Sequence, residues 1–429
     1  MTISERLRQL WQAKEIRNDI FFVLMVLVVF RIGAHIPIPG VDVGNLRQFF
    51  ASNQILGLLN LFSGGGLENF SIMMLGVGPY ITASIIFQLL TMIVPKLEEL
   101  SKEGEAGQRK INQYTRWATV PLAILQGFGF ITLLQRQGGS VSLLGDLTTF
   151  QYVTAILTVT AGTMFLTWLG ELISERRLGN GISLLIFAGI VAGLPTAIQQ
   201  TLLVIDKTQI TNMVLFALIA IVTVIGVVYI TEGQRNIPVS YARRVRGQKM
   251  YGGVNTHLPI RVNIGGVIPI IFAISVILFP PMIAQFFVQA KSAWLAQTAN
   301  FIIQIFNDNL FYGIIYFLLV VAFTYFYSAV VFNPEQIAEN LQKQGGFIPG
   351  IRPGRQTAEY LRQVVNRLNL TGSIFLGAIA VLPLILRAFT GVNTLVIGGT
   401  SLLIVVSVVL EVVKRVETQL QMHEYEVKA

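Results

Sequence analysis

The sequence predicts an all-α membrane protein with ten transmembrane helices, and two observations lead to that fold class. Ten apolar stretches carry almost no charge, and the basic residues concentrate in alternate connections between them. A hydrocarbon core of roughly 30 Å needs about 20 residues of helix to cross it. The predicted spans are residues 20–38, 72–94, 115–135, 152–173, 182–203, 212–231, 264–288, 310–332, 370–390 and 394–413.

The distribution of Lys and Arg predicts the orientation of these spans. Of the 31 basic residues, six lie in the odd-numbered connections, and the other 25 lie in the N-terminus, the even-numbered connections and the C-terminal tail. By the positive-inside rule both termini are cytoplasmic, which requires an even number of crossings. The six exceptions are Arg31, Arg47, Arg136, Lys207, Lys291 and Arg387.

Composition supports the membrane class and excludes some chemistry. Hydrophobic residues make up 53% of the chain and charged residues 12%, whereas soluble domains have about 25% charged residues. The net charge of +9 reflects the loop bias and predicts contact with anionic lipid headgroups or an acidic partner. The chain has no cysteine, which excludes disulfides and a thiol nucleophile.

The first span has an alternative interpretation as a cleaved signal peptide, because basic residues precede an apolar run that starts at Ile20. That run continues into residues 30–40 without a small-x-small cleavage site, so we interpret it as a retained span. The next stretch, residues 55–62, is apolar but too short to cross, and Ser63 and three glycines follow it. It is either a re-entrant or plugging helix or an interfacial helix lying flat on the outer surface.

Ten spans divide as five plus five, which predicts an N-terminal half of residues 1–203 and a C-terminal half of 204–429. With an odd number of spans in each half, the second half enters from the opposite side, so an inverted repeat is geometrically allowed. This prediction rests on span counting, since the two halves show no clear repeat of residues.

Two long basic loops, residues 232–263 and 333–369, are predicted to form ordered cytoplasmic projections. Partial alternation on either side of Gly247 predicts a hairpin that turns there. In the second loop, Asn333 and Pro334 predict the start of a short helix that Gly345 and Gly346 end. A polar helix over residues 356–366 then leads into the ninth span.

The signatures of enzymes and ion-coupled carriers are missing from the sequence. No predicted span has Asp, Glu, Lys or Arg near its middle, where such groups mark ion relays. His35, His257 and His423 are scattered without ligand spacing, and no Gly-Lys-Ser/Thr nucleotide loop is present. We therefore predict a protein that is not an enzyme and that needs no cofactor or metal.

Isoleucines recur one helical turn apart, Ile81 with Ile85 and Ile182 with Ile186, so each pair shares a helix face. Such pairs are typical of lipid-facing or core packing, and a hydrophobic constriction that blocks ions is also compatible with them. The polar residues Gln88, Asn263 and Ser275 in the second and seventh spans are uncharged, which is ordinary in contacts between membrane helices.

Several longer motifs are spread along the chain. They are FRIG at 30–33, IPIPG at 36–40, PYITASII at 79–86, KEGE at 102–105, RKI at 109–111, GNGIS at 179–183, THLP at 256–259, FNP at 332–334, PGIRPG at 349–354 and GGTSLLI at 398–404. With these motifs, the chain resembles the SecY family, whose members form the central subunit of the bacterial protein-conducting channel. The resemblance extends from about Arg17 to Val416.

The resemblance implies an hourglass pore between the two five-span halves, with an apolar ring at its waist and a plug over residues 55–65. It also implies a lateral gate toward lipid between the second and seventh spans, and a cytoplasmic docking site. Matched by motif, the ring is Ile81, Ile85, Ile182, Ile186, Ile271 and Ile404, the plug includes Ile55, Leu58, Leu59, Leu61, Phe62 and Gly65, the gate includes Gln88, Asn263 and Ser275, and the docking residues are Arg243, Arg244, Arg352 and Arg355.

The function implied is passage of unfolded secretory polypeptides, with signal sequences and transmembrane segments released laterally into lipid. The implied partners are the small membrane subunits SecE and SecG, the SecA ATPase motor, and the ribosome, including contact of its RNA with the basic loops. The implied location is the bacterial plasma (inner) membrane or a thylakoid membrane. Two rival interpretations are a secondary transporter, which needs a mid-depth coupling or substrate site, and a structural subunit without a pore.

Overall fold

The computed structural model describes residues 11, 13–39, 44, 46, 60, 63–137, 148–203, 210–241, 244–246, 249–251, 255–288, 290–390 and 399–428. Each of the ten predicted spans overlaps a helix or a pair of helices, in agreement with the predicted all-α class. The corresponding elements are α2 (Lys14–Gly33), α5 (Gly78–Ile93), α7 (Glu105–Gln137), α8 (Thr149–Glu175), α9 (Gly181–Leu203), α10 (Ile210–Glu232), α11 (Ile268–Ile277) with α12 (Phe279–Phe287), α14 (Asn309–Val331), α16 (Arg355–Thr390) and α17 (Gly399–Lys428).

Proline divides one predicted span into two helices and marks the predicted end of another. Two helices make up the predicted span 264–288; they meet at Leu278, and prolines follow at positions 280 and 281. Proline lacks the N–H that a continuing helix needs. The predicted span 72–94 ends where a proline follows: α5 ends at Ile93, Val94 is its C-cap, and α6 (Pro95–Lys102) continues at an angle of 101°. A further helix, α13 (Ala293–Asn307), was not predicted.

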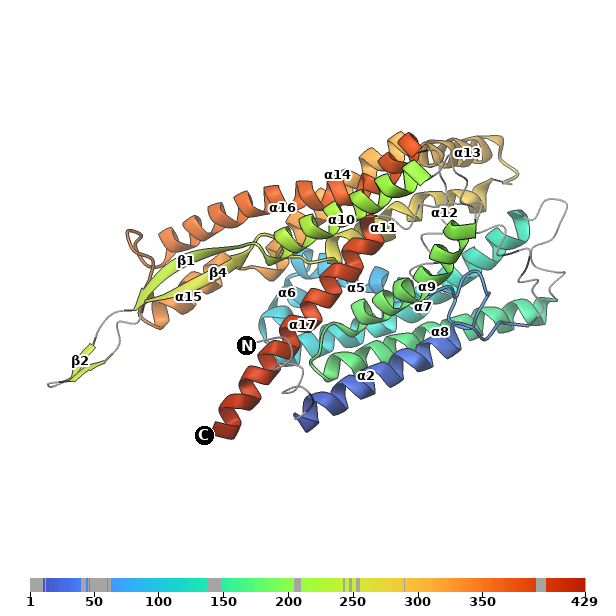
Figure 1. Cartoon of the computed structure of the whole chain (residues 1–429). Helices are drawn as coiled ribbons and strands as arrows, with labels where there is room; N and C mark the ends of the chain where they lie inside the picture. The colour runs from blue at the N-terminus through green and yellow to red at the C-terminus, as the bar shows by residue number, and fades with distance from the viewer. Residues whose placement is uncertain are drawn as a thin grey trace.

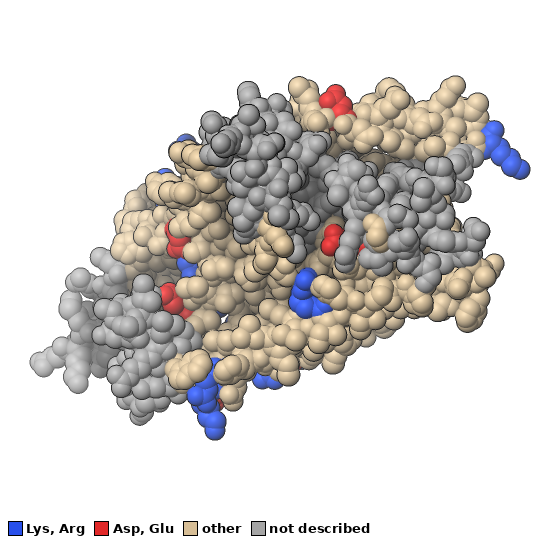
Figure 2. Space-filling view, turned by 45° about the vertical axis from the view of Figure 1, so that its right-hand side comes forward, with Lys and Arg blue, Asp and Glu red and all other residues tan. Residues whose placement is uncertain are grey.

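Apolar side chains cover much of the outer surface, as expected for a protein that faces lipid. On α14, Leu310, Ile314 and Leu318 are each more than half exposed and recur every four residues, so they form one stripe. Figure 2 shows a face on which Lys, Arg, Asp and Glu are sparse. Within the described residues, three helices are long and apolar enough to cross a membrane, and the bent α5–α6 pair also qualifies. The count of ten crossings stays a prediction.

The helices form two groups that meet along a long interface (Figure 1). Helices α2, α7, α8 and α9 lie together, and α10, α14 and α16 lie together on the other side. Two helices border both groups: α5 contacts α7 and α11, while α17 contacts α9 and α10. Residues from both groups make up the largest hydrophobic core, which therefore holds the two groups together.

The two long loops form one ordered projection at the end of the molecule where α17 also ends (Figure 1). Strand β1 (Gln234–Tyr241) pairs antiparallel with β4 (Asn255–Arg261) and with β5 (Gly346–Phe347), which comes from the second loop. Beyond them, β2 (Arg244–Arg246) pairs antiparallel with β3 (Lys249–Tyr251), which confirms the predicted hairpin, while its predicted turn at Gly247 lies outside the described residues. A small core joins the sheet to α16. Its members include Ile237, Ile260, Ile348, Leu361 and Val364.

The short helix of the second loop, α15 (Pro334–Lys343), begins and ends where the sequence predicts. The Asn333 side-chain oxygen accepts hydrogen bonds from the backbone N–H groups of Glu335 and Gln336, at 3.1 and 3.2 Å. Gly345 follows the helix with a φ of 75°, a conformation that favours glycine. An ion pair between Glu335 and Arg362, 2.9 Å long, ties α15 to α16.

Candidate functional site

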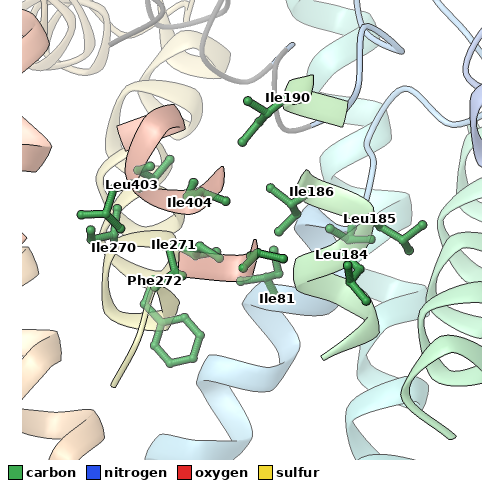
Figure 3. Packing of buried hydrophobic residues seen from close by; sticks show 14 of the residues in the cluster. Ile81, Leu184, Leu185, Ile186, Ile190, Ile270, Ile271, Phe272, Leu403 and Ile404 are labelled. Carbon is green, nitrogen blue, oxygen red and sulfur yellow. The ribbon is translucent and has the colours of Figure 1, made fainter. Parts of the chain in front are cut away.

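The six isoleucines assigned to the ring come together in the largest hydrophobic core. They project from four helices, α5, α9, α11 and α17, and so from both helix groups. Figure 3 shows Ile81, Ile186, Ile271 and Ile404 gathered at the centre of this core. Ile404 is fully buried, and Ile182 is the one partly exposed member. The six side chains therefore belong to one apolar cluster that carries no charge.

The GNGIS motif explains how Ile182 and Ile186 are positioned. The Asn180 side-chain oxygen accepts hydrogen bonds from the backbone N–H groups of Ile182 and Ser183, at 3.0 and 3.3 Å, which fixes the start of α9. At position 181 a Cβ atom would lie 1.8 Å from the Gly170 carbonyl oxygen, so only glycine lets α9 approach α8 this closely. The motif thus caps α9 and lets it pack closely on α8, so that the face with Ile182 and Ile186 lies against the core.

A polar cavity of about 390 Å³ lies on the side of this core that faces the strands. Charged residues line its outer part, where Lys414 and Glu232 form an ion pair of 2.7 Å and Arg261 marks the end of β4. Ser183 and Ser407 line it close to the ring, since each is within one turn of a ring isoleucine. The lining therefore combines charged and hydroxyl side chains with apolar ones such as Ile264 and Val267.

A second cavity, of about 110 Å³, lies along the contact between the two helix groups, which we call the seam. Ile81 and Thr82 of α5 and Ile271 and Ser275 of α11 face it from opposite sides. Gln126 of α7 also lines it, and its amide nitrogen lies 3.5 Å from the Thr82 hydroxyl. The sequence did not single out Gln126, because the two residues are 44 positions apart and no local pattern links them.

The three residues predicted for the lateral gate lie in different places. Ser275 lines the seam cavity and donates a hydrogen bond to the Ile271 carbonyl at 2.9 Å. Asn263 lines the polar cavity, and its amide nitrogen donates to the Gly266 carbonyl at 3.2 Å. The Gln88 amide nitrogen donates to Ser84 on its own helix at 3.3 Å, and Gln88 lines neither cavity. Only Ser275 therefore lies at the seam cavity itself.

The glycine segment, residues 63–66, is the described end of the predicted plug. Gly64 and Gly65 have φ values of 67° and 83°, in the left-handed region that glycine adopts readily. Ser63 lines the seam cavity, so the plug region and the seam are neighbours. Of the residues assigned to the plug, Gly65 is described, while Ile55, Leu58, Leu59, Leu61 and Phe62 lie outside the described residues.

The predicted docking arginines belong to the projection that the two long loops form. Arg352 is exposed between Gly350 and Gly354, whose φ values of 82° and 95° make the turns that present it. Arg355 begins α16, and its side chain is 92% exposed. Arg244 lies in β2, and Arg243 lies outside the described residues. Among the residues that the structure describes, no three His, Asp or Glu side chains gather as a metal site.

The comparisons with known proteins agree with this arrangement. A model of the SecY family matches residues 71–413, which is well over half of the chain. This chain belongs to the SecY family. A relative from Streptomyces galbus, named protein translocase subunit SecY, is 44% identical over 431 residues and covers 97% of each chain. SecY relatives from Mycobacterium tuberculosis and Vibrio cholerae are 46% and 45% identical, with 96% of this chain covered and 96% and 93% of theirs.

Solved structures show the same fold at lower identity. A SecY structure whose plug domain is described as stabilising the closed translocation channel matches with a TM-score of 0.62 and 18% identity, and covers 92% of this chain and 91% of that one. Sec61 in a canine ribosome-channel complex matches with a TM-score of 0.59 and 17% identity over the same shares. The predicted SecY-like fold is therefore confirmed.

Proposed function

We propose that this membrane protein is the protein-conducting subunit of a Sec translocon, through which unfolded secretory polypeptides cross the membrane. The single observation that carries the proposal is the isoleucine ring: an apolar, charge-free waist built from four helices, with a polar cavity leading to it. SecY-family membership agrees with this role. The channel is not an enzyme, and translocation needs an external source of energy.

The ring and the polar cavity suit a substrate of varied sequence. An exposed backbone and charged side chains are costly in lipid, because nothing there satisfies their hydrogen bonds. A polar cavity lowers that cost, and an apolar waist yields to any chain without binding one tightly. At rest the same isoleucines exclude ions, since they offer an ion no ligand. Selective closure and unselective passage thus come from the same six side chains.

The seam is the proposed exit toward lipid for signal sequences and transmembrane segments. It is lined mainly by apolar side chains, and an apolar helix gains free energy when it leaves water for such a surface or for lipid. Ser275, Thr82 and Gln126 add polar groups to this lining without a buried charge, and their hydrogen bonds stay on one side of the seam: Ser275 bonds within α11, and Gln126 of α7 bonds to Thr82 of α5. Gln88 and Asn263 remain proposed members of the gate.

Cross-linking the seam should stop lateral release. The chain has no cysteine, so the paired substitutions Thr82→Cys and Ser275→Cys introduce the only two thiols. A short bifunctional thiol reagent joining them is expected to abolish membrane insertion of a model transmembrane segment, because α5 and α11 can no longer separate. Insertion is measured by carbonate extraction, with each single-cysteine variant treated alike as the control. Undiminished insertion by the cross-linked pair would place the exit elsewhere.

The proposed partners are SecE, SecG, SecA and the ribosome, with ribosomal RNA contacting the basic loops. The exposed Arg352 and Arg355, with Arg243 and Arg244, form the proposed docking surface of the projection. The proposed location is a bacterial inner membrane, with both termini and the projection in the cytoplasm. The excess of Lys and Arg in the corresponding connections supports this orientation.

Reconstitution tests the function directly. The protein is placed in lipid vesicles with SecE and SecG, and SecA, ATP and an unfolded secretory precursor are added. Protection of the precursor from external protease should depend on ATP. Absence of protection, with the motor and precursor proven active on another translocon, would favour the transporter or structural-subunit interpretation.

Deleting residues 58–65 should raise the resting ion conductance of these vesicles. The proposed plug adds a second obstruction to the ring, so its loss leaves a thin apolar constriction as the only barrier. Conductance is measured in planar bilayers before any precursor is added. Translocation by the same deletion variant is measured as well, and normal translocation shows that the channel is folded. Unchanged conductance would support the alternative in which this helix lies flat on the membrane surface.

A further inference from the structure

Arg31 lies in the last turn of α2 and reaches the glycine segment. Its guanidinium Nη1 donates a hydrogen bond to the Gly64 carbonyl oxygen at 2.6 Å, across 33 positions of sequence. The side chain is partly buried, and the nearby Glu68 carboxylate attracts its charge. A hydrogen bond from a charged donor is roughly twice as strong as one between neutral groups. One cation therefore fixes a backbone group of a segment that is rich in glycine.

The other side of this segment is tied by a reciprocal pair of hydrogen bonds. The Asn60 amide nitrogen donates to a Glu68 carboxylate oxygen at 2.9 Å, and the Glu68 backbone N–H donates to the Asn60 side-chain oxygen at 3.0 Å. The Asn60 carbonyl also accepts from the backbone N–H of Gly65 at 2.9 Å. Asn60, within the predicted plug, is thus joined to the glycine segment, and Arg31 joins that segment to the helix bundle.

Gly64 also fits tightly against the bundle. A Cβ atom at this position would lie 2.7 Å from the Phe30 ring and 3.2 Å from the Gly189 Cα of α9. Phe30 is itself buried in the largest core. Two consecutive residues of α2 therefore act on Gly64, one by packing and one by a hydrogen bond. The segment cannot swing outward without breaking both contacts.

We infer that Arg31 is a positioning residue that holds the glycine segment, and with it the plug, in the sealed arrangement. The inference rests on the plug role proposed above. When the plug is displaced, the Gly64 carbonyl moves away from Arg31, and a partly buried cation loses its acceptor. Removing the cation lowers the barrier to that displacement, so the plug leaves its seat more often.

The test is the resting ion conductance of Arg31→Met, which keeps the length of the side chain and removes its charge and donors. We expect a rise of several-fold, with a smaller rise for Arg31→Lys, which keeps the charge on a single ammonium group. The matched control is Arg176→Met. Arg176 contacts the other end of α2, through an ion pair of 3.1 Å with Asp19, and should leave the conductance unchanged. Thermal unfolding of each variant in detergent monitors the fold.

Combining Arg31→Met with deletion of residues 58–65 separates a role in plug positioning from a general structural role. The deletion removes Gly64, so the combined variant should conduct no more than the deletion alone. Additional conductance in the combined variant would contradict the inference. The inference would also be contradicted if the deletion raised the conductance and Arg31→Met left it unchanged. In that case the plug role itself would stand. A deletion without any effect would overturn both the plug and the role of Arg31.

Discussion

Replacing Arg352 with glutamate is expected to lower SecA-driven translocation by about tenfold or more. The side chain is exposed between two glycine turns, so its charge is available to a partner. Reversing a charge at a docking surface removes an attraction and adds a repulsion, and about 1.4 kcal/mol of interaction free energy corresponds to a factor of ten. Translocation is measured by protease protection of a precursor in vesicles.

The fold should survive this change. The Arg352 backbone carbonyl, which accepts a hydrogen bond from Thr357 at 2.9 Å, is retained when the side chain is replaced. The control is Lys291→Glu, the same charge reversal at an exposed residue between α12 and α13. If Arg352→Glu translocates at the normal rate under conditions in which SecA binding limits that rate, the prediction that Arg352 is a docking residue is wrong.

Replacing Ile404 with asparagine is the second change with a large expected effect. Ile404 is fully buried in the ring, and a buried amide without partners costs about 1–3 kcal/mol in the packed state. In the proposed channel the open state places this position next to water and substrate, so the penalty falls mainly on the closed state. We expect the population of the closed state relative to the open state to fall roughly tenfold for each 1.4 kcal/mol by which the substitution destabilises the closed state.

Two measurements report this shift: the resting ion conductance should rise, and precursors with defective signal sequences should be translocated. The matched control is Leu403→Asn, because Leu403 is as buried as Ile404. Consecutive residues of an α-helix project about 100° apart around its axis, so the two side chains of α17 point in different directions. Figure 3 shows both side chains. Both variants should lose stability, and only Ile404→Asn should change signal selectivity. Equal effects of the two would remove Ile404 from the ring.

The sequence was sufficient to predict the helices and much of the projection that the two long loops form. Charge-free apolar runs located the spans, and Asn333 with Pro334 located α15, because capping chemistry is local. The break at Leu278 was missed although two prolines follow it, since an apolar run of that length also fits a continuous span. Helix α13 was missed because polar residues interrupt its apolar pattern.

The site was harder to predict than the fold. Pairs such as Ile81 with Ile85 define a helix face, but the same spacing occurs in ordinary packing, so the resemblance had to supply the ring. Contacts between distant residues, such as Gln126 with Thr82 or Arg31 with Gly64, leave no periodic trace in the sequence. They follow from how the helices pack, which the sequence encodes only through the whole fold.

Two ring isoleucines, Ile81 and Ile271, also line the seam cavity, and this double membership has a thermodynamic consequence. Under the proposed lateral release, an apolar helix that separates α5 from α11 would pull these two side chains apart and so weaken the proposed waist. The transfer free energy of the signal helix is thereby linked to the opening of the aqueous path. By reciprocity, anything that loosens the waist should increase the apparent affinity of the seam for weak signals. Recognition and permeation are then a single equilibrium, and the hydrophobicity of the cargo sets its position.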